Sequence, residues 1–313
     1  MQAVLITEQE VSVSETDRPI HSDTELLVKV ASAGLNGADL LQVKGNYPPP
    51  PGYRHDIPGL ELAGVVVEAG AGATRFKVGD RVMGIVGGAA QAEYAIIEDA
   101  VAMRVPDEVD ITTAGGFPEV FTTSYDALIL QAGLTLGERV CVHGAAGGVG
   151  LAAIQLAVAA GAEVIATTRN TEHRDDIAGL GATVITPEEF ANSGDYDVIL
   201  ELVGAPNMSQ NLNQLRIGGR IVVIGVGAGA RFEIDLRLMM AKRSRILAST
   251  LRARSVAEKA TITKAMESHV VPLLREGRLQ IHEHASFPLT QAPEAYNSFA
   301  RGGKLGKVIL FNA

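Results

Sequence analysis

The sequence predicts an α/β protein with a doubly wound parallel sheet of six strands and a separate, mostly antiparallel, barrel-like domain. Three observations carry this prediction. The chain has 313 residues, more than one hydrophobic core usually serves. Short alternating strands fill the first part, up to about Gly116. From about Thr122 onward, apolar strands alternate with helix-length segments, a rhythm that indicates a parallel sheet.

The barrel-like domain begins with MQAVLITEQEVSV, which alternates as a strand does. The segments ELLVKVASAG and GVVVEAG continue the strand pattern, and KVGD supplies a turn signal. PPPPG at 48–52 is the only proline-rich loop. We assign residues 1–117 to this domain.

The second domain is expected over residues 118–265. Its six strand candidates, with helical stretches between most of them, are RVCVHG, EVIATT, ATVIT, YDVILELVG, GRIVVIGVG and RILAST. The helix-like run SVAEKATITKAMESHVVPLLREG follows, and ASFPLT and KLGKVILFN then look like strands again. We therefore expect residues 266–313 to return to the first domain.

The composition excludes several classes of protein. Hydrophobic residues make up 47% and charged residues 20%, and no apolar run approaches the ~20 residues of a membrane span. MQAVLITEQEVSV lacks the features of an export signal, so we expect a cytoplasmic protein. The net charge of −9 provides no basic surface for nucleic acid. The single cysteine, Cys141, rules out an intrachain disulfide and a multi-cysteine zinc cluster.

The stretch RVCVHGAAGGVGLAAIQLAVAAG, residues 139–161, has the strand–turn–helix form of a dinucleotide-binding turn. Ala145, Gly147 and Gly150 occupy the three small-residue places, with alanine replacing the usual first glycine. The helix N-terminus offers free amides and a positive dipole end to a pyrophosphate. A mobile linker, or tight packing of strand and helix without a ligand, is the alternative. The expected cofactor contacts are Ala146, Gly147, Gly148 and Val149.

The end of the second strand, EVIATTRN, indicates which dinucleotide binds. It lacks the Asp or Glu that would accept hydrogen bonds from an adenosine ribose. Thr168 offers a hydroxyl and Arg169 a guanidinium suited to a phosphate, with Arg174 nearby, so we expect NADPH. Two alternatives stay open: Arg169 is a solvated surface residue, or Glu172 faces the ribose and NADH is the cofactor.

Motifs along essentially the whole chain resemble one family. They are HGAAGGVG, GLNGADLLQVKGNYPPPPG, IPGLELAGVV, RVMGIVGGAAQAEYA, PEVFTTSYDAL and the closing GKVIL. The chain resembles the medium-chain dehydrogenase/reductase superfamily, and within it the zeta-crystallin-like NADPH quinone oxidoreductases. The resemblance implies a Rossmann sheet in the second domain and a GroES-like barrel in the first. It also implies a homodimer joined through the sixth strand, near RILAST.

The same resemblance exposes a departure at the metal site. Zinc alcohol dehydrogenases carry a cysteine where this chain has Asn36 and a histidine where it has Leu60. Leucine cannot ligate a metal and asparagine is a poor zinc ligand. We therefore expect no metal. Without a Lewis acid, electron-poor acceptors become the expected substrates, because conjugation spreads the charge that develops when hydride arrives.

The resemblance implies two residues at the reacting atoms. Asn36 is expected near the nicotinamide, where its amide can donate to substrate or ribose, and Tyr47 caps the pocket and gives a hydrogen bond or a proton to the acceptor oxygen. The alternatives are that Asn36 only makes a turn and that Tyr47 only packs. Thr123 resembles the threonine that contacts the carboxamide end of the cofactor. Further cofactor contacts at strand ends are Val203, Gly204, Gly225, Val226, Thr250, Leu251 and Arg252.

The sequence thus predicts a zinc-independent oxidoreductase that transfers hydride from NADPH to quinones or related α,β-unsaturated carbonyl compounds. One alternative is an enone or enoyl double-bond reductase without quinone activity. The other is a non-catalytic NADPH-binding protein, either crystallin-like or a redox sensor. The expected partners are a small-molecule quinone or enone and a second copy of the chain, with no nucleic acid and no membrane.

Overall fold

A computed structural model describes residues 1–312 and divides the chain into two compact units. Unit 1 comprises Met1–Thr122 and Leu251–Ala313, and unit 2 comprises Thr123–Thr250. The return to unit 1 comes at Leu251, ahead of the expected residue 266. The reason lies in α8, Val256–His269, which packs into unit 1 and donates from Thr263 Oγ1 to the Val101 carbonyl at 3.3 Å.

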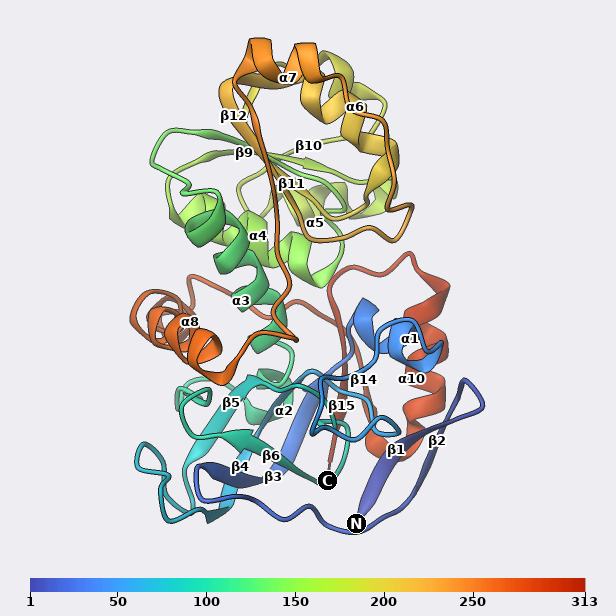
Figure 1. Ribbon diagram of the computed structural model, residues 1–313, viewed down its shortest axis with the longest axis vertical. Helices are drawn as coiled ribbons and strands as arrows, with labels where there is room; N and C mark the ends of the chain where they lie inside the picture. Colours follow the sequence, from blue (N-terminus) through green and yellow to red (C-terminus); the bar gives the residue numbers. More distant parts are fainter. Residues whose placement is uncertain (313) are drawn as a thin grey trace. The chain divides into compact units, whose positions relative to one another are not determined.

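Unit 2 contains the predicted six-stranded parallel sheet (Figure 1). The strand order is β10-β9-β8-β11-β12-β13, and every neighbouring pair is parallel. This order confirms a doubly wound Rossmann sheet. The strands are β8 Arg139–Val142, β9 Glu163–Thr167, β10 Thr183–Ile185, β11 Tyr196–Glu201, β12 Leu215–Val223 and β13 Arg245–Ala248.

Helices lie on both faces of this sheet. Met208 and Leu212 of α6 pack with Leu238 of α7 in the cluster that covers one face. Figure 1 shows α4 on the other side of the sheet, and it packs on β8 and β9. The helical segments of unit 2 are η1 Asp126–Gln131, α4 Gly148–Ala159, η2 Thr171–His173, α5 Arg174–Ala178, η3 Glu189–Asn192, α6 Ala205–Asn213 and α7 Leu236–Lys242.

Unit 1 is built on a mostly antiparallel seven-stranded sheet. The order is β14-β15-β3-β4-β5-β7, with β6 paired to β3, and only β14 and β15 run parallel. The closing strands come from the C-terminal segment, as predicted. The strands are β3 Glu25–Gly34, β4 Glu61–Ala69, β5 Arg81–Ile85, β6 Tyr94–Glu98, β7 Met103–Arg104, β14 Glu283–Pro288 and β15 Lys307–Phe311.

The first segment of the chain forms a hairpin rather than the single alternating strand expected. Strands β1, Gln2–Thr7, and β2, Glu10–Glu15, are antiparallel. The two turn residues both have positive φ, 51° at Glu8 and 67° at Gln9, which matches the twist of a tight hairpin. Because the turn lacks Asn and Gly, the sequence carried no hairpin signal.

Helices complete unit 1. The helix-like run after residue 254 forms two helices, α8 and α9, because Pro272 has no N–H to continue a helix. Elsewhere, α10 packs Tyr296 against Val4 and Leu310. The helical segments beside α8 are α1 Gly37–Val43, α2 Ile111–Ala114, α9 Val271–Arg275, η4 Leu289–Gln291 and α10 Ala292–Arg301, while the unit boundary falls inside α3, Pro118–Tyr125. Among the described residues, no helix has both the length and the apolar character of a membrane span.

Candidate functional site

The glycine-rich turn of unit 2 follows β8. Ala145 N–H donates to the Thr167 carbonyl at 3.1 Å, which ties the turn to the end of β9. A Cβ at Gly150 would lie 2.6 Å from the Ala145 carbonyl oxygen, so this glycine allows the helix to pack on the turn. At Gly147 the nearest atom would be the Gly144 carbonyl oxygen at 3.5 Å. The protein's own packing therefore does not require glycine at position 147, and this face is open to a ligand.

Helix α4 begins directly after this turn, with Gly147 as an extended N-cap. In the described part of the chain no side chain caps this helix, which leaves the first-turn amides at Gly148 and Val149 for a ligand. Ser124 Oγ donates to the Val149 carbonyl at 3.1 Å, so the end of α3 lies against this turn. With half-buried Ala146, the four predicted contacts form one continuous segment at a helix N-terminus that suits an anion.

Thr123 lies in α3, immediately before Ser124, and its side chain is buried. Its neighbour Thr122 was missed by the sequence analysis. Among residues 1–312, Thr122 Oγ1 is one of the buried polar side-chain atoms without a hydrogen-bond partner. Since buried hydroxyls are nearly always paired, this orphan fits a position beside a bound polar group.

The end of β9 distinguishes the two arginines that the sequence offered for a phosphate. Thr168 is buried and its Oγ1 pairs with the backbone of Asn170, at 3.2 Å to N and 3.3 Å to O. Arg169 is exposed. Arg174, in contrast, donates to the Val184 carbonyl at 2.9 Å. Arg174 is exposed as well, so the two side chains differ in that Arg169 has no hydrogen-bond partner among the described residues.

The glycines after β11 and β12 are required by the backbone itself. Gly204 has a φ of 117°, and a Cβ there would lie 2.5 Å from the Gly229 carbonyl oxygen. A Cβ on Gly225 would lie 2.3 Å from the Leu202 carbonyl oxygen. Because these two residues have no side chain, the loops after β11 and β12 can approach each other closely.

The remaining strand-end candidates differ in exposure. Val203 is half-buried and Val226 is 49% exposed, and their contact with a cofactor stays a prediction. Thr250, exposed, is the last residue of unit 2, and Leu251, buried, is the first residue of the returning segment of unit 1.

Arg252 holds the loop that carries Tyr47. Its guanidinium donates to the Gly87 carbonyl at 2.8 Å, to the Tyr47 carbonyl at 2.9 Å and to Gln42 Oε1 at 2.5 Å. The guanidinium carbon lies 5.2 Å from the centre of the Tyr47 ring. Arg252 thus donates to three acceptors of unit 1. Its predicted contact with the cofactor stays a prediction. Tyr47 itself is half-buried.

Asn36 belongs to a buried charge cluster. Its Nδ2 donates to Glu61 Oε1 at 2.9 Å and to the Gly34 carbonyl at 3.4 Å. Its Oδ1 accepts from Lys307 Nζ at 2.8 Å, and the same ammonium donates to Glu61 Oε1 at 2.6 Å. Glu61 and Lys307 are both almost wholly buried, and neither was expected to act here. The positive charge beside this amide and this carboxylate is therefore the ammonium of Lys307.

Glu119, in the first turn of α3, adds a second carboxyl to this cluster. Its backbone N–H donates to Glu61 Oε2 at 2.8 Å. Burial first, and then repulsion by Glu61, raises the pKa of Glu119 to about 8, so this carboxyl holds its proton at neutral pH. Burial and the neighbouring Glu119 also raise the pKa of Tyr47. Glu119 carries no signal in the sequence, because an acidic residue in a first helical turn is ordinary.

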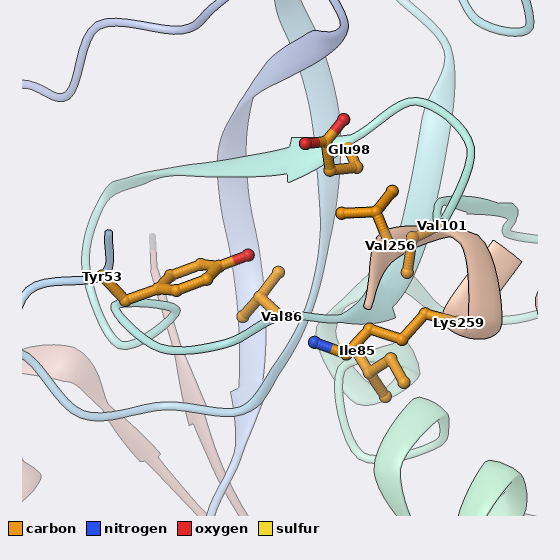
Figure 2. Close-up of a pocket in the computed structure, with 7 residues that line it drawn as sticks. All are labelled: Tyr53, Ile85, Val86, Glu98, Val101, Val256 and Lys259. Carbon is orange, nitrogen blue, oxygen red and sulfur yellow. The ribbon is translucent and has the colours of Figure 1, made fainter. Parts of the chain in front are cut away.

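A small pocket in unit 1 lies beside Lys259 (Figure 2). The residues with polar side chains that line it are Tyr53, Glu98 and Lys259, and Lys259 Nζ also donates to the Arg252 carbonyl at 2.9 Å. Burial lowers the pKa of Lys259, with a further decrease from Arg252. In the part of the chain that the structure describes, none of the predicted site residues lines this pocket. Its lining residues are Tyr53, Ile85, Val86, Glu98, Val101, Val256 and Lys259.

The donor set does not suit a zinc ion. Leu60 is buried and has no ligating atom, while Asn36 and Glu61 are bonded to the Lys307 ammonium. Within residues 1–312, no three His, Cys, Asp or Glu side chains come together as possible metal ligands.

Comparisons with known proteins agree with both units. Residues 22–130 match the family described as "Alcohol dehydrogenase GroES-like domain", and residues 148–268 match the family described as "Zinc-binding dehydrogenase". Human quinone oxidoreductase is 33% identical over 306 residues, which cover 93% of this chain and 90% of that protein.

Two solved structures share the fold over nearly their whole length. The quinone oxidoreductase from Coxiella burnetii superposes with a TM-score of 0.81 at 25% identity, covering 100% of this chain and 99% of that one. The cobalt- and zinc-bound thermostable alcohol dehydrogenase from Pyrobaculum aerophilum gives a TM-score of 0.85 at 28% identity, covering 99% of each chain. The fold is thus shared by a protein named for quinones and by one that binds metal.

Proposed function

Since this chain belongs to the medium-chain dehydrogenase/reductase superfamily of oxidoreductases, we propose that it transfers hydride from NADPH to quinones or related α,β-unsaturated carbonyl acceptors without zinc. The observation that carries the proposal is the Lys307 ammonium bonded to both Glu61 and Asn36. A divalent cation there would have to displace an ammonium from its buried carboxylate, which is costly. The likeness to human quinone oxidoreductase supports the choice of acceptor.

Unit 2 supplies the groups that fit NADPH. The open face at Gly147 admits a pyrophosphate close to the backbone, and the amides of Gly148 and Val149 can donate to it. Arg169 is proposed to pair with the 2′-phosphate, with Thr168 beside it. When bound, the nicotinamide supplies the hydride. Thr123 and the orphaned hydroxyl of Thr122, the residue just before unit 2, are suited to orient a carboxamide.

Unit 1 supplies the groups proposed to act on the acceptor. Two-electron reduction of a carbonyl-conjugated acceptor consumes one hydride and one proton, and the proton must reach an acceptor oxygen. Tyr47 is proposed to donate to that oxygen. Protonated Glu119 lies nearby, and burial and Glu119 raise the pKa of Tyr47, so its hydroxyl keeps the proton that it donates. Asn36 has one strongly bonded N–H, while its 3.4 Å bond to Gly34 is the one that can be exchanged for substrate or ribose.

The test is NADPH oxidation, followed by absorbance at the nicotinamide band, against a panel of quinones and enones. We expect turnover with quinones and a kcat/KM for NADPH well above that for NADH. Alkene reduction without quinone turnover would establish the enone or enoyl reductase instead. Nucleotide binding without turnover of any acceptor would establish a non-catalytic protein and refute the proposal.

A further inference from the structure

A chain of buried polar side chains runs beneath the loops proposed to hold the nucleotide. It starts at Glu201, the last residue of β11, and passes through Asn211 of α6 to His143, which follows β8, and to Thr167, the last residue of β9. All four side chains are at least nine-tenths buried. The proposed function uses none of them, so their arrangement needs its own explanation.

Glu201 organises two loops at once. Its Oε1 accepts from the backbone N–H of Val203 at 2.6 Å and of Gly204 at 2.8 Å. Its backbone carbonyl accepts from the N–H of Ile224 at 3.0 Å and of Gly225 at 3.1 Å. One residue therefore sets the path of the loops after β11 and after β12.

The other carboxylate oxygen fixes the direction of every remaining bond. Glu201 Oε2 accepts from Asn211 Nδ2 at 2.6 Å, so the amide oxygen of Asn211 is the atom left to face His143. Asn211 Oδ1 then accepts from His143 Nε2, at 2.8 Å. His143 Nδ1, left without its proton, accepts from Thr167 Oγ1, at 3.0 Å. Every donor in the chain thus points toward Glu201.

His143 stays neutral in this arrangement. Burial lowers the pKa of His143, and this effect is opposed by Glu201 and by the Asn211 hydrogen bond. The neighbouring Cys141 Sγ lies 3.9 Å from Nε2, and burial raises the pKa of that thiol, so it brings no charge. The Nε2–H tautomer is therefore the one that satisfies both ring nitrogens.

We propose that Glu201, Asn211, His143 and Thr167 form a one-directional hydrogen-bond relay that positions the loops after β8, β9, β11 and β12 for nucleotide binding. The relay adds side-chain hydrogen bonds between the ends of strands that are already neighbours in the sheet. Thr167 also accepts Ala145 N–H on its carbonyl, at 3.1 Å, which brings the glycine-rich turn into the same network. These are positioning residues: they act on the nucleotide through the loops. The inference rests on the proposed function for the identity of the ligand.

A matched pair of variants at Thr167 separates hydrogen bonding from packing. Thr167→Val keeps the shape and removes the hydroxyl, whereas Thr167→Ser keeps the hydroxyl and removes a methyl group. We expect Thr167→Val to weaken NADPH binding about tenfold, and Thr167→Ser to stay within about twofold of the unmodified protein, by titration of nucleotide fluorescence. The reverse order would mean that this position only packs, and would overturn the proposal.

A second measurement reads the relay directly. In the unmodified protein, ¹⁵N NMR of the histidine rings should show His143 with its proton on Nε2. In Glu201→Gln the new amide donates toward Asn211, whose own amide must flip, so the proton of His143 is expected to move to Nδ1. The exposed Glu188→Gln should leave the ring unchanged. A proton on Nδ1 in the unmodified protein would refute the relay.

The two proposals fail in different ways. An unmodified protein that binds NADPH but reduces no acceptor would refute the proposed function and leave the relay standing. An unmodified protein that binds neither NADPH nor NADH would refute both. Equal NADPH affinity in Thr167→Val and the unmodified protein would refute the relay alone.

Discussion

Arg169 and Arg174 show how local structure separates two residues that look alike in sequence. Both are exposed and in position for a phosphate, but Arg174 is bonded to the Val184 carbonyl and paired with Glu189, whereas Arg169 has no such partner among the described residues. The proposed preference for NADPH over NADH therefore depends on one guanidinium.

Arg169→Ala is expected to raise the KM for NADPH by on the order of tenfold and to leave the KM for NADH nearly unchanged. The reason is that a charge-assisted hydrogen bond to a phosphate contributes about 1.5–3 kcal/mol. Steady-state kinetics with both nucleotides measures the effect. The exposed Arg237→Ala is the matched control, and an equal loss in both variants would contradict the assignment.

Glu119 should leave a signature in the pH dependence of stability. Its pKa of about 8 in the folded protein lies above the ordinary value of 4.5, so between these pH values the folded protein keeps a proton that the unfolded chain has lost. Stability therefore falls as pH rises through this window, with a slope of at most about 1.4 kcal/mol per pH unit. Asp39, with a pKa raised to about 6 by burial, adds a contribution of the same sign at lower pH.

We expect Glu119→Gln to flatten this decline between about pH 6 and pH 8 and to be more stable than the unmodified protein at pH 8. Urea unfolding at a series of pH values measures it, with the exposed Glu10→Gln as control. Identical pH profiles for Glu119→Gln and the unmodified protein would show that Glu119 is ionised in the fold.

At the scale of elements, the sheet strands were predictable and the hairpin was not. Each strand of the parallel sheet is a short apolar run between turn signals, and this local pattern is enough to identify it. In the β1–β2 turn, Glu8 and Gln9 instead have positive φ, a conformation that these residue types rarely adopt. The turn propensities of Glu8 and Gln9 did not predict the hairpin, because the pairing of β1 with β2 imposes this turn.

The buried polar partners were unpredictable for a different reason: they join residues far apart in the chain. Lys307 and Glu61 are separated by 246 positions, and Arg252 and Gln42 by 210. No local pattern in a single sequence specifies such a pair. The glycine-rich turn was predictable because its strand, turn and helix are contiguous, and Asn36 and Tyr47 came only from the family resemblance.

The loop carrying Tyr47 accepts a hydrogen bond from the Arg252 side chain in addition to its own backbone bonds. Arg252→Met removes three hydrogen bonds, to Gly87, Tyr47 and Gln42, and leaves buried acceptors unpaired. We expect faster amide hydrogen exchange over residues 44–53 and a KM for the acceptor raised several-fold. The exposed Arg301→Met is the control. Unchanged exchange in this loop would contradict the role of Arg252 as its clamp.

At the scale of the whole molecule, β13 ends the parallel sheet with only β12 as its partner among the described strands. Leu236 and Met240 of the neighbouring α7 are 63% and 76% exposed. An open strand edge beside apolar side chains favours self-association, and we propose that two copies of the chain join there.

The unmodified protein is therefore expected to sediment as a dimer. The double variant Leu236→Glu with Met240→Glu should shift it toward monomer, because four like charges would meet at a two-fold interface. Val78→Glu, at a comparably exposed position in unit 1, should remain dimeric. A double variant that stays dimeric would place the interface elsewhere.

The proposed zinc-free reaction depends on the buried Lys307 ammonium, which is bonded to Asn36 and Glu61 and leaves them no room for a metal ion. The most direct measurement combines metal analysis with turnover: the protein is dialysed against a strong chelator, its zinc content is quantified, and its NADPH-dependent quinone reduction is then assayed. We predict full activity with far less than one zinc per chain. Stoichiometric zinc whose removal abolishes activity, and whose return restores it, would contradict the account.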